Sequence, residues 1–188
     1  MKDKIGIIVD GQGDYASLRA RFNGQYKIIK TDGPRGHCAT NEQIVSNSRK
    51  QIRILRGFGC GRIIALIDYE CRNQGIEAFI EQLNKLFIKE HGKNVEACVP
   101  NRMIENWYLA DIVFLSKNKK YLKTLPKQKN YEGTHGKEEL KKLMVNKAKY
   151  NEVKHGSELF GMLRFEEARK NSPSFNVFLQ VLAKSATA

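Results

Sequence analysis

Two apolar runs that each stop at an acidic residue constrain the fold of this chain more than any other feature. Residues 4–9 run into Asp10, and residues 62–67 run into Asp68. Continuous apolar runs of this length are typical of strands that are buried on both faces of a parallel sheet. Ligands of open parallel sheets gather at the carboxyl ends of the strands. We therefore expect Asp10 and Asp68 to lie at one edge of a parallel sheet.

More acidic residues follow the same two runs. Asp14 comes after a turn that contains Gly11 and Gly13, and Glu70 stands two residues after Asp68. Four carboxylates at one edge repel one another unless a cation lies between them. Mg²⁺ prefers oxygen ligands and keeps several waters beside one or two carboxylates. The pattern therefore predicts a site for one or two divalent cations, which would clamp a phosphodiester for in-line attack.

Glu105 is a further candidate for this metal site. It opens an expected helix after the fourth strand, so it would lie near the same edge of the sheet. An alternative is that Glu105 is a first-turn acid that the helix dipole stabilises. Asp14 has a similar alternative as a helix N-cap. That explanation fits Asp10 and Asp68 less well, because each of them ends a buried strand.

Strands and helices are expected to alternate along residues 1–116. The expected strands are residues 4–9, 26–31, 62–67 and 95–99, and the expected helices include residues 15–20, 44–55, 74–87 and 103–115. Such alternation predicts an α/β fold, with a Rossmann-like parallel sheet that is flanked by helices. In the flavodoxin-like strand order, the first and third strands are neighbours. That order would bring the two acidic strand ends together.

Residues 117–188 are expected to form a basic, mainly helical C-terminal region that packs on the core of residues 1–116. Lysine and arginine outnumber aspartate and glutamate by 12 to 4 in residues 117–155, against 17 to 13 in residues 1–116. Short helices are expected at residues 138–144 and 158–165, and a last one from Ser172 onward. The uneven distribution singles out this region as the basic part of the chain.

The formal net charge of +13 favours a polyanionic partner, with nucleic acid first and an anionic membrane surface second. Lys119, Lys120 and Lys123 are candidate phosphate contacts, and the alternative is a solvated lysine-rich face. No apolar run approaches the length of a membrane span, and the N-terminus lacks the apolar core of a signal peptide. We therefore expect a cytoplasmic protein with no membrane partner.

A dinucleotide site is a rival interpretation of the first turn. Residues 11–16 fit the pattern G-x-G-x-x-A, and Asp32 lies about where a ribose-binding acid would stand. Asp10 and Asp14 weigh against this interpretation, because both stand in the loop that would hold the pyrophosphate. Such a loop ordinarily binds the diphosphate through backbone N–H groups and the helix N-terminus, without a metal. Two carboxylates there would repel it.

The order of these motifs resembles the Toprim domain, which topoisomerases, primases and nucleases of the overcoming-lysogenization-defect type share. More closely, the chain is similar to a family of small Toprim-like proteins of bacterial phage-defence loci. The motifs that carry the resemblance are Val9-Asp10-Gly11-Gln12-Gly13-Asp14, Asp68-Tyr69-Glu70, Glu105-Asn106-Trp107-Tyr108-Leu109-Ala110-Asp111, Tyr150 with Lys154, and Ser172-Pro173-Ser174-Phe175. They span nearly the whole chain.

The resemblance implies a metal-dependent nuclease that cleaves DNA or RNA as a toxic effector in antiviral defence, beside a companion ATPase. Its cofactor would be Mg²⁺ or Mn²⁺. The roles that we assign are catalysis for Asp10, Asp68 and Glu70, metal binding for these three with Asp14 and Glu105, and phosphate binding for Gly11, Gly13 and Lys154.

Two residues depart from the family pattern. The first catalytic residue of the family is a glutamate where this chain has Asp10, and the family has an aspartate where this chain has Glu70. The number of carboxylates is unchanged, but the reach of each changes by one methylene. The alternative function is therefore a catalytically inactive nucleic-acid-binding or sensor subunit of an ATPase-containing defence complex.

Overall fold

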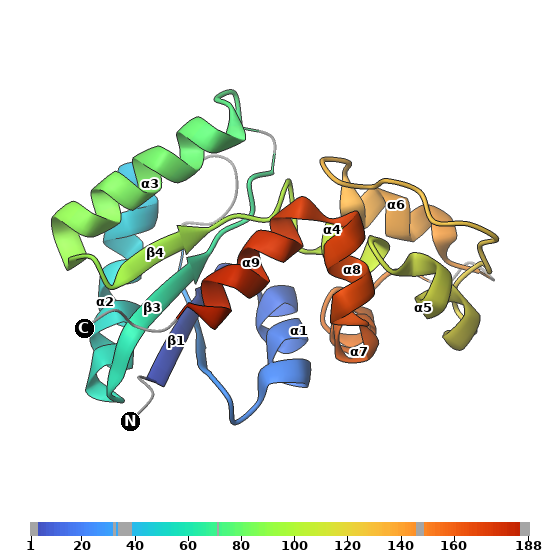
Figure 1. The fold of residues 1–188 in the computed structure, drawn as a ribbon, viewed down its shortest axis with the longest axis horizontal. Coiled ribbons are helices and arrows are strands. Elements are labelled where there is room, and N and C mark those ends of the chain that lie inside the picture. The colour runs from blue at the N-terminus through green and yellow to red at the C-terminus, as the bar shows by residue number, and fades with distance from the viewer. Residues whose placement is uncertain (1–3, 32, 34–38, 71, 146–148, 185–188) are drawn as a thin grey trace.

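Four parallel strands form the sheet of the computed structural model, which describes residues 4–31, 33, 39–70, 72–145 and 149–184. The strands are β1 (Lys4–Val9), β2 (Lys27–Lys30), β3 (Cys60–Leu66) and β4 (Val95–Cys98). They lie in the order β2-β1-β3-β4, so the expected pairing of the first and third strands is confirmed. Helices flank the sheet, as Figure 1 shows. The α/β fold with a Rossmann- or Toprim-like parallel sheet is likewise confirmed.

The register of β1 and β3 places their acidic ends side by side. Val9, the last residue of β1, pairs with Leu66, the last residue of β3. Asp10 follows at once, and Asp68 follows two residues later. Both acids therefore leave the carboxyl edge of the sheet from neighbouring strands.

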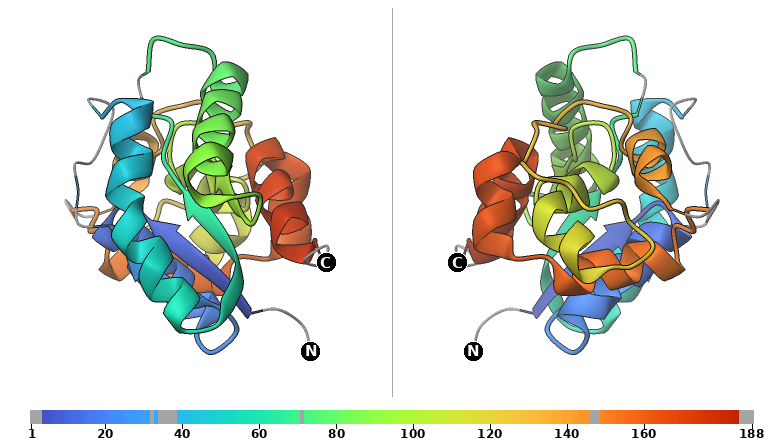
Figure 2. Two further views of the ribbon diagram at one scale, coloured as in Figure 1. Left: turned by 90° about the vertical axis from the view of Figure 1, so that its left-hand side faces the viewer. Right: turned by 90° about the vertical axis from the view of Figure 1, so that its right-hand side faces the viewer.

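Each face of the sheet is covered by its own apolar core. Ile7 and Val9 face one core, which includes helix α1 (Gln12–Phe22) and the helices after β4. Ile8 faces the other core, which α2 (Asn41–Gly57) and α3 (Ile76–His91) supply. Figure 2 shows α2 and α3 on the same side of the sheet. Burial on both faces explains why the ends of β1 and β3 are continuously apolar.

The remaining helices gather beyond the carboxyl edge of the sheet, except that α9 lies beside β4 (Figure 1). They are α4 (Glu105–Leu109), α5 (Ile112–Asn118), α6 (Gly136–Leu143), α7 (Lys154–Met162), α8 (Phe165–Asn171) and α9 (Pro173–Ala183). This half of the molecule packs directly on the sheet, because residues such as Leu140 and Phe160 share one core with Ile7 and Val9. Residue 116 lies inside α5, so no irregular linker separates the regions there.

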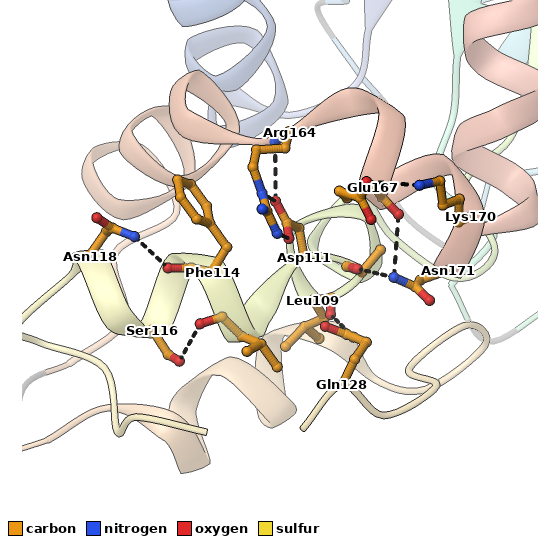
Figure 3. A network of polar contacts seen from close by, with 12 residues as sticks. Leu109, Asp111, Phe114, Ser116, Asn118, Gln128, Arg164, Glu167, Lys170 and Asn171 are labelled. Atoms are coloured by element: carbon orange, nitrogen blue, oxygen red, sulfur yellow. Dashed lines mark hydrogen bonds and ion pairs between the residues drawn. The ribbon is translucent and has the colours of Figure 1, made fainter. Parts of the chain in front are cut away.

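Two expected helices are interrupted in the structure, and one ion pair joins the two points of interruption. The helix expected at residues 103–115 is broken into α4 and α5 at Asp111, and the helix expected at residues 158–165 ends at Met162. The carboxylate of Asp111 accepts hydrogen bonds from the backbone N–H of Arg164 at 3.2 Å and from its guanidinium at 2.9 and 2.6 Å. Figure 3 shows this contact at the turn between α7 and α8. Sequence periodicity carries no signal for such a long-range pair.

Trp107 fixes α9 to the rest of the molecule. Its ring stacks on Phe178 with centroids 4.8 Å apart, and its indole N–H donates to Oγ of Ser174 at 3.0 Å. Trp107 is fully buried, so it is a core residue. Within the described parts of the chain, no helix is both long enough and apolar enough to cross a membrane.

Candidate acidic site at the carboxyl edge of the sheet

Three carboxyl groups from three different elements meet beyond the carboxyl ends of the strands. Asp14 lies in the first turn of α1, Asp68 follows β3, and Glu105 begins α4. Burial raises the pKa of Asp68 well above its ordinary value, and the negative charges of Asp14 and Glu105 raise it further. The three groups therefore act on one another, and we call them the central carboxyls.

Asp14 and Glu105 also hold their protons more tightly than ordinary carboxyls do. Burial raises the pKa of Asp14 to about 6, although a hydrogen bond from the backbone of Gly11 and the charge of Lys137 oppose the rise. Burial raises the pKa of Glu105 to about 7, and Asp14 adds to that rise. Near neutral pH the site therefore carries carboxyls that are only partly ionised, unless a cation enters.

Glu105 is the most deeply buried of the three, with 2% of its surface exposed. Its Oε1 accepts a hydrogen bond from the hydroxyl of Tyr150 at 3.1 Å. Its Oε2 is buried and has no hydrogen-bond partner among the described residues. A buried carboxylate oxygen without a partner is costly. This oxygen is therefore available to a proton or to a cation.

Asp14 and Asp68 are each fixed by a backbone N–H group. Oδ2 of Asp14 accepts from the N–H of Gly11 at 3.0 Å, which is a capping contact at the start of α1. Oδ1 of Asp68 accepts from the N–H of Ile104 at 3.2 Å, which links the end of β3 to the start of α4. Asp14 is thus both a capping residue and a member of the central carboxyls.

Lys137 is the cation of this site, and the sequence patterns did not reveal it. Its charge lowers the pKa of Asp14, Asp68 and Glu105 against the effect of burial. Burial would lower the pKa of Lys137 itself, but Glu105, Glu152 and Asp68 together hold it above its usual value. Its Nζ lies 3.0 Å from Oε1 of Glu152.

A glycine lets Lys137 approach the carboxyls. A Cβ atom at Gly136 would lie 2.8 Å from Cβ of Glu105 and 3.0 Å from the backbone nitrogen of Asn106. The start of α6 therefore packs against the start of α4 at a distance that only glycine allows. The sequence signal for this contact is one glycine in a lysine-rich stretch, which is too common to identify a site.

Asp10 and Glu70 lie at the margins of the central carboxyls. The charge of Asp10 raises the pKa of Asp14, and Oδ1 of Asp10 accepts from the hydroxyl of Thr31 at 3.2 Å. The charge of Glu70 raises the pKa of Asp68. The backbone of Glu70 is in the left-handed region, with φ of 54°, and its N–H donates to the carbonyl of Arg102 at 2.7 Å. Catalytic roles for Asp10 and Glu70 stay predictions.

The donor chemistry of the central carboxyls suits Mg²⁺. Among the residues that the structure describes, no three histidine, cysteine, aspartate or glutamate side chains are arranged so that they could hold one metal ion. Mg²⁺ needs only one or two carboxylates, because waters complete its octahedron. Asp68 and Glu105 supply hard oxygen donors, and Oε2 of Glu105 is buried without a partner. These two residues fit such an ion.

The glycines that were expected to bind phosphate have structural contacts. The N–H of Gly11 donates to Asp14, and a Cβ at Gly13 would lie 2.9 Å from Cβ of Glu152. Gly13 therefore allows the loop that carries Glu152 to pack on α1. A phosphate-binding role for Gly11 and Gly13 stays a prediction.

The four lysines that were expected to bind phosphate or nucleic acid differ in their exposure and contacts. Lys154 begins α7 with an exposed side chain, whereas the lysine whose charge acts on all three central carboxyls is Lys137. Nζ of Lys119 donates to Glu158 at 3.0 Å, and Nζ of Lys123 donates to the carbonyl of Lys142 at 2.8 Å. Lys120 is exposed. Binding of phosphate or nucleic acid by these four lysines stays a prediction.

A buried tyrosine, Tyr108, lies near the central carboxyls and links the helices that carry them. The hydroxyl of Tyr108 donates to Oγ of Ser17 at 2.7 Å, and Ser17 donates to the carbonyl of Gly13 at 2.7 Å. A Cβ at Gly156 would lie 2.9 Å from Oγ of Ser17 and 3.4 Å from the hydroxyl of Tyr108. These contacts join α1, α4 and α7 next to the site. The sequence patterns did not identify them.

The fold and the site define an α/β protein with a Rossmann- or Toprim-like sheet and acidic residues at its carboxyl edge. The chain belongs to the family described as "Domain of unknown function (DUF4276)", whose model matches residues 16–183. That range contains Asp68, Glu105 and Lys137, and it begins after Asp10 and Asp14. No curated protein matches the chain, and no solved structure does.

Proposed function

We propose that this protein is a metal-dependent phosphodiesterase that cleaves DNA or RNA. One observation carries the proposal, which is that Oε2 of Glu105 at the carboxyl edge is buried and has no partner among the described residues, next to the Ile104 N–H that donates to Asp68. Open parallel sheets bind their ligands at this edge. Carboxylates crowded together in this way favour a divalent cation, because it relieves their repulsion.

Each residue of the site would have its own role in hydrolysis. Asp68 and Glu105 would hold Mg²⁺ or Mn²⁺, which supplies charge neutralisation and Lewis acidity at a phosphate. Lys137 would bind a non-bridging phosphate oxygen from the side of α6, because its ammonium lies close enough to Glu105 and Asp68 to be influenced by the two residues that would hold the ion. Asp10 would accept a proton from the attacking water.

The biological setting rests on the motif resemblance alone. Small Toprim-like proteins of phage-defence loci share the order of the acidic motifs, so we infer an effector in antiviral defence. The same resemblance implies an ATPase that acts with it. The basic composition of the chain, with a net charge of +13, supports nucleic acid as the substrate.

A second candidate is a catalytically inactive subunit that binds nucleic acid for a partner. The observation that favours it is the position of Lys137, which places a positive charge among the carboxyls and is ion-paired to Glu152. In that case the lysine would take the place of a metal ion. The acidic residues would then serve the structure of the site rather than hydrolysis.

Cleavage assays distinguish the two candidates. Labelled plasmid, single-stranded DNA and transfer RNA are each incubated with the protein in Mg²⁺, in Mn²⁺ and in chelator. The nuclease proposal predicts that at least one substrate is cut with either metal and that none is cut in chelator. The binding-subunit proposal predicts a mobility shift without cleavage in all three conditions. Cleavage that persists in chelator would contradict the metal dependence.

A further inference from the structure

A groove lies at the amino edge of the sheet, away from the acidic site. It is formed where β1, β2 and β3 begin and along α1, near the end marked N in Figure 1. Six of its lining residues carry the argument, and we call them the basic–aromatic groove: Lys4, Tyr15, Arg19, Tyr26, Lys27 and Phe58. The groove has a volume of about 580 Å³, which falls in the range of ligand-binding clefts.

The charge of the groove is entirely positive among the described residues that line it. Lys4, Arg19 and Lys27 contribute three cations, and no aspartate or glutamate lines it with them. Within the described parts of the chain, none of the three forms an ion pair with an acid. Their neighbour Cys60 lies close enough that Lys4 and Lys27 oppose the rise of its pKa on burial. The groove therefore suits an anion.

Aromatic rings alternate with these cations. Phe58 is 51% exposed at the end of α2, and Nζ of Lys27 lies 3.9 Å from the centre of its ring. The guanidinium of Arg19 lies 5.5 Å from the centre of the ring of Tyr15 and donates to its hydroxyl at 3.1 Å. Nζ of Lys27 lies over one face of this ring, so a base would stack on the part of the ring that stays exposed, next to a positive charge.

We propose that the basic–aromatic groove binds single-stranded nucleic acid. Binding of single strands combines a positive groove that follows the phosphates with aromatic side chains on which unpaired bases stack. The bases of a duplex are already stacked on one another, so the rings favour a single strand. An acidic peptide would match the cations but would leave the exposed ring of Phe58 without a flat partner. This inference stands whether or not the acidic site is catalytic.

Helix α1 carries residues of both the acidic site and the groove. Tyr15 lines the groove, and it directly follows Asp14 in the same helix. A strand that lies on Phe58 and Lys27 at the amino edge and continues along α1 would therefore point toward the central carboxyls. The groove would thus also hold a substrate strand for cleavage, if the protein is the nuclease proposed above.

Binding of fluorescein-labelled oligo(dT) and oligo(U), measured by anisotropy in chelator, tests the groove without cleavage. Phe58→Ala should weaken binding about tenfold, since stacking on one aromatic ring contributes on that order. The double variant Lys4→Gln/Lys27→Gln should reduce the slope of log affinity against log salt by about 1.4, or about 0.7 for each lost phosphate contact on a single strand. Both variants alter exposed side chains. Because Nζ of Lys27 lies over the ring of Phe58, the salt slope, rather than the affinity at one salt concentration, reports the loss of charge.

Matched controls lie on α3. Ile88 is 48% exposed, so Ile88→Ala removes a similar exposed apolar side chain, and Lys85→Gln/Lys89→Gln removes two exposed charges. Both should leave binding within about twofold of the unaltered chain. Equal binding by the groove variants and the controls would overturn the proposal. Duplex DNA or anionic lipid vesicles that bind as tightly as the oligonucleotides through the same residues would overturn it too.

Discussion

The hydroxyl of Tyr150 donates a hydrogen bond to Oε1 of Glu105 at 3.1 Å and so joins residues 45 positions apart. This bond ties the segment before α7 to the start of α4. Burial, and then the charges of Tyr108 and Glu105, raise the pKa of Tyr150 far above its ordinary value, so the hydroxyl remains a donor at any physiological pH. The C-terminal half of the chain therefore completes the acidic site, because it contributes Lys137, Tyr150 and Glu152.

Glu105→Gln should stabilise the protein without metal at alkaline pH. The pKa of Glu105 is about 7 in the folded protein and 4.5 ordinarily. The folded protein therefore keeps a proton that the unfolded chain loses, and the free energy of unfolding falls as pH rises from about 4.5 to 7. The unaltered protein therefore loses about 3 kcal/mol of its free energy of unfolding by pH 8. The glutamine variant cannot ionise at this position and should not show that loss. Thermal unfolding in chelator at pH 4.5 and pH 8 measures the difference.

Glu166→Gln is the matched control, because the side chain of Glu166 is 78% exposed on α8. It should change stability little at either pH. If Glu105→Gln is no more stable than the unaltered chain at pH 8, the buried oxygen of Glu105 is satisfied in some other way, and the electrostatic description of the site is wrong.

Lys137→Gln should have the opposite effect. The charge of Lys137 lowers the pKa of all three central carboxyls. Without it, the carboxyls repel one another more strongly when they ionise. We expect a loss of about 2–4 kcal/mol at pH 8 and a smaller loss at pH 5, where more of the carboxyls are protonated. Urea unfolding at the two pH values measures both losses.

Lys141→Gln on the same helix is the control for Lys137→Gln. Lys141 is exposed and paired with Glu138, and such surface pairs contribute about 0–1 kcal/mol. An equal loss in the two variants, or a loss in Lys137→Gln that does not vary with pH, would show that Lys137 does not act on the central carboxyls.

Gly136→Ala should destabilise the protein by about 1–3 kcal/mol, because the added methyl group would press on Glu105 and on the backbone of Asn106. Gly57→Ala at the end of α2 is the contrasting variant, since nothing lies within 4 Å of its added Cβ. It should be neutral or more stable by a few tenths of a kcal/mol. Equal unfolding midpoints for the two alanine variants would contradict the close packing of α6 on α4.

Asp111→Asn should weaken the connection between α5 and the turn before α8. The variant keeps the shape of the side chain but loses the charge that holds the guanidinium of Arg164 (Figure 3). We expect a loss of about 1–3 kcal/mol, discounted because half of the Arg164 side chain is exposed. Arg164→Lys should lose a comparable amount, since lysine cannot form the bidentate contact. Additive losses in the double variant would show that the two residues do not interact.

The sheet and its acidic edge could be predicted from the sequence because both depend on local patterns. The first and third strands are mainly apolar runs, and these two runs stop at Asp10 and Asp68. The neighbouring position of β1 and β3 then follows from the alternation of strands and helices. Asp14 was expected at this edge because it follows the turn after the first strand, and Glu105 because it opens the helix after the fourth strand.

Lys137 and Glu152 could not be predicted, because tertiary contacts bring them to the site, and the sequence offered Tyr108 only as part of a motif, without its contact to Ser17. Lys137 stands in a lysine-rich stretch and looks like its exposed neighbours until α6 packs on α4 through Gly136. Lys154, in contrast, has an exposed side chain. The lysines expected from the sequence were proposed for contact with phosphate or nucleic acid, and none of them was expected to act on the central carboxyls. Lys137 is identified by its partly buried position near Glu105 and Asp68, which the sequence alone does not show.

Binding of Mn²⁺ tests the central claim most directly, because it needs no knowledge of the substrate. Electron paramagnetic resonance follows free Mn²⁺ during titration of the unaltered protein, Asp68→Asn and the control Glu166→Gln. We predict that the unaltered protein and the control bind Mn²⁺ alike, that their affinity rises between pH 5.5 and pH 8 as the central carboxyls ionise, and that Asp68→Asn weakens binding at least about tenfold. Equal affinity of all three proteins at pH 8, or no binding by any of them, would contradict a metal site at the carboxyl edge.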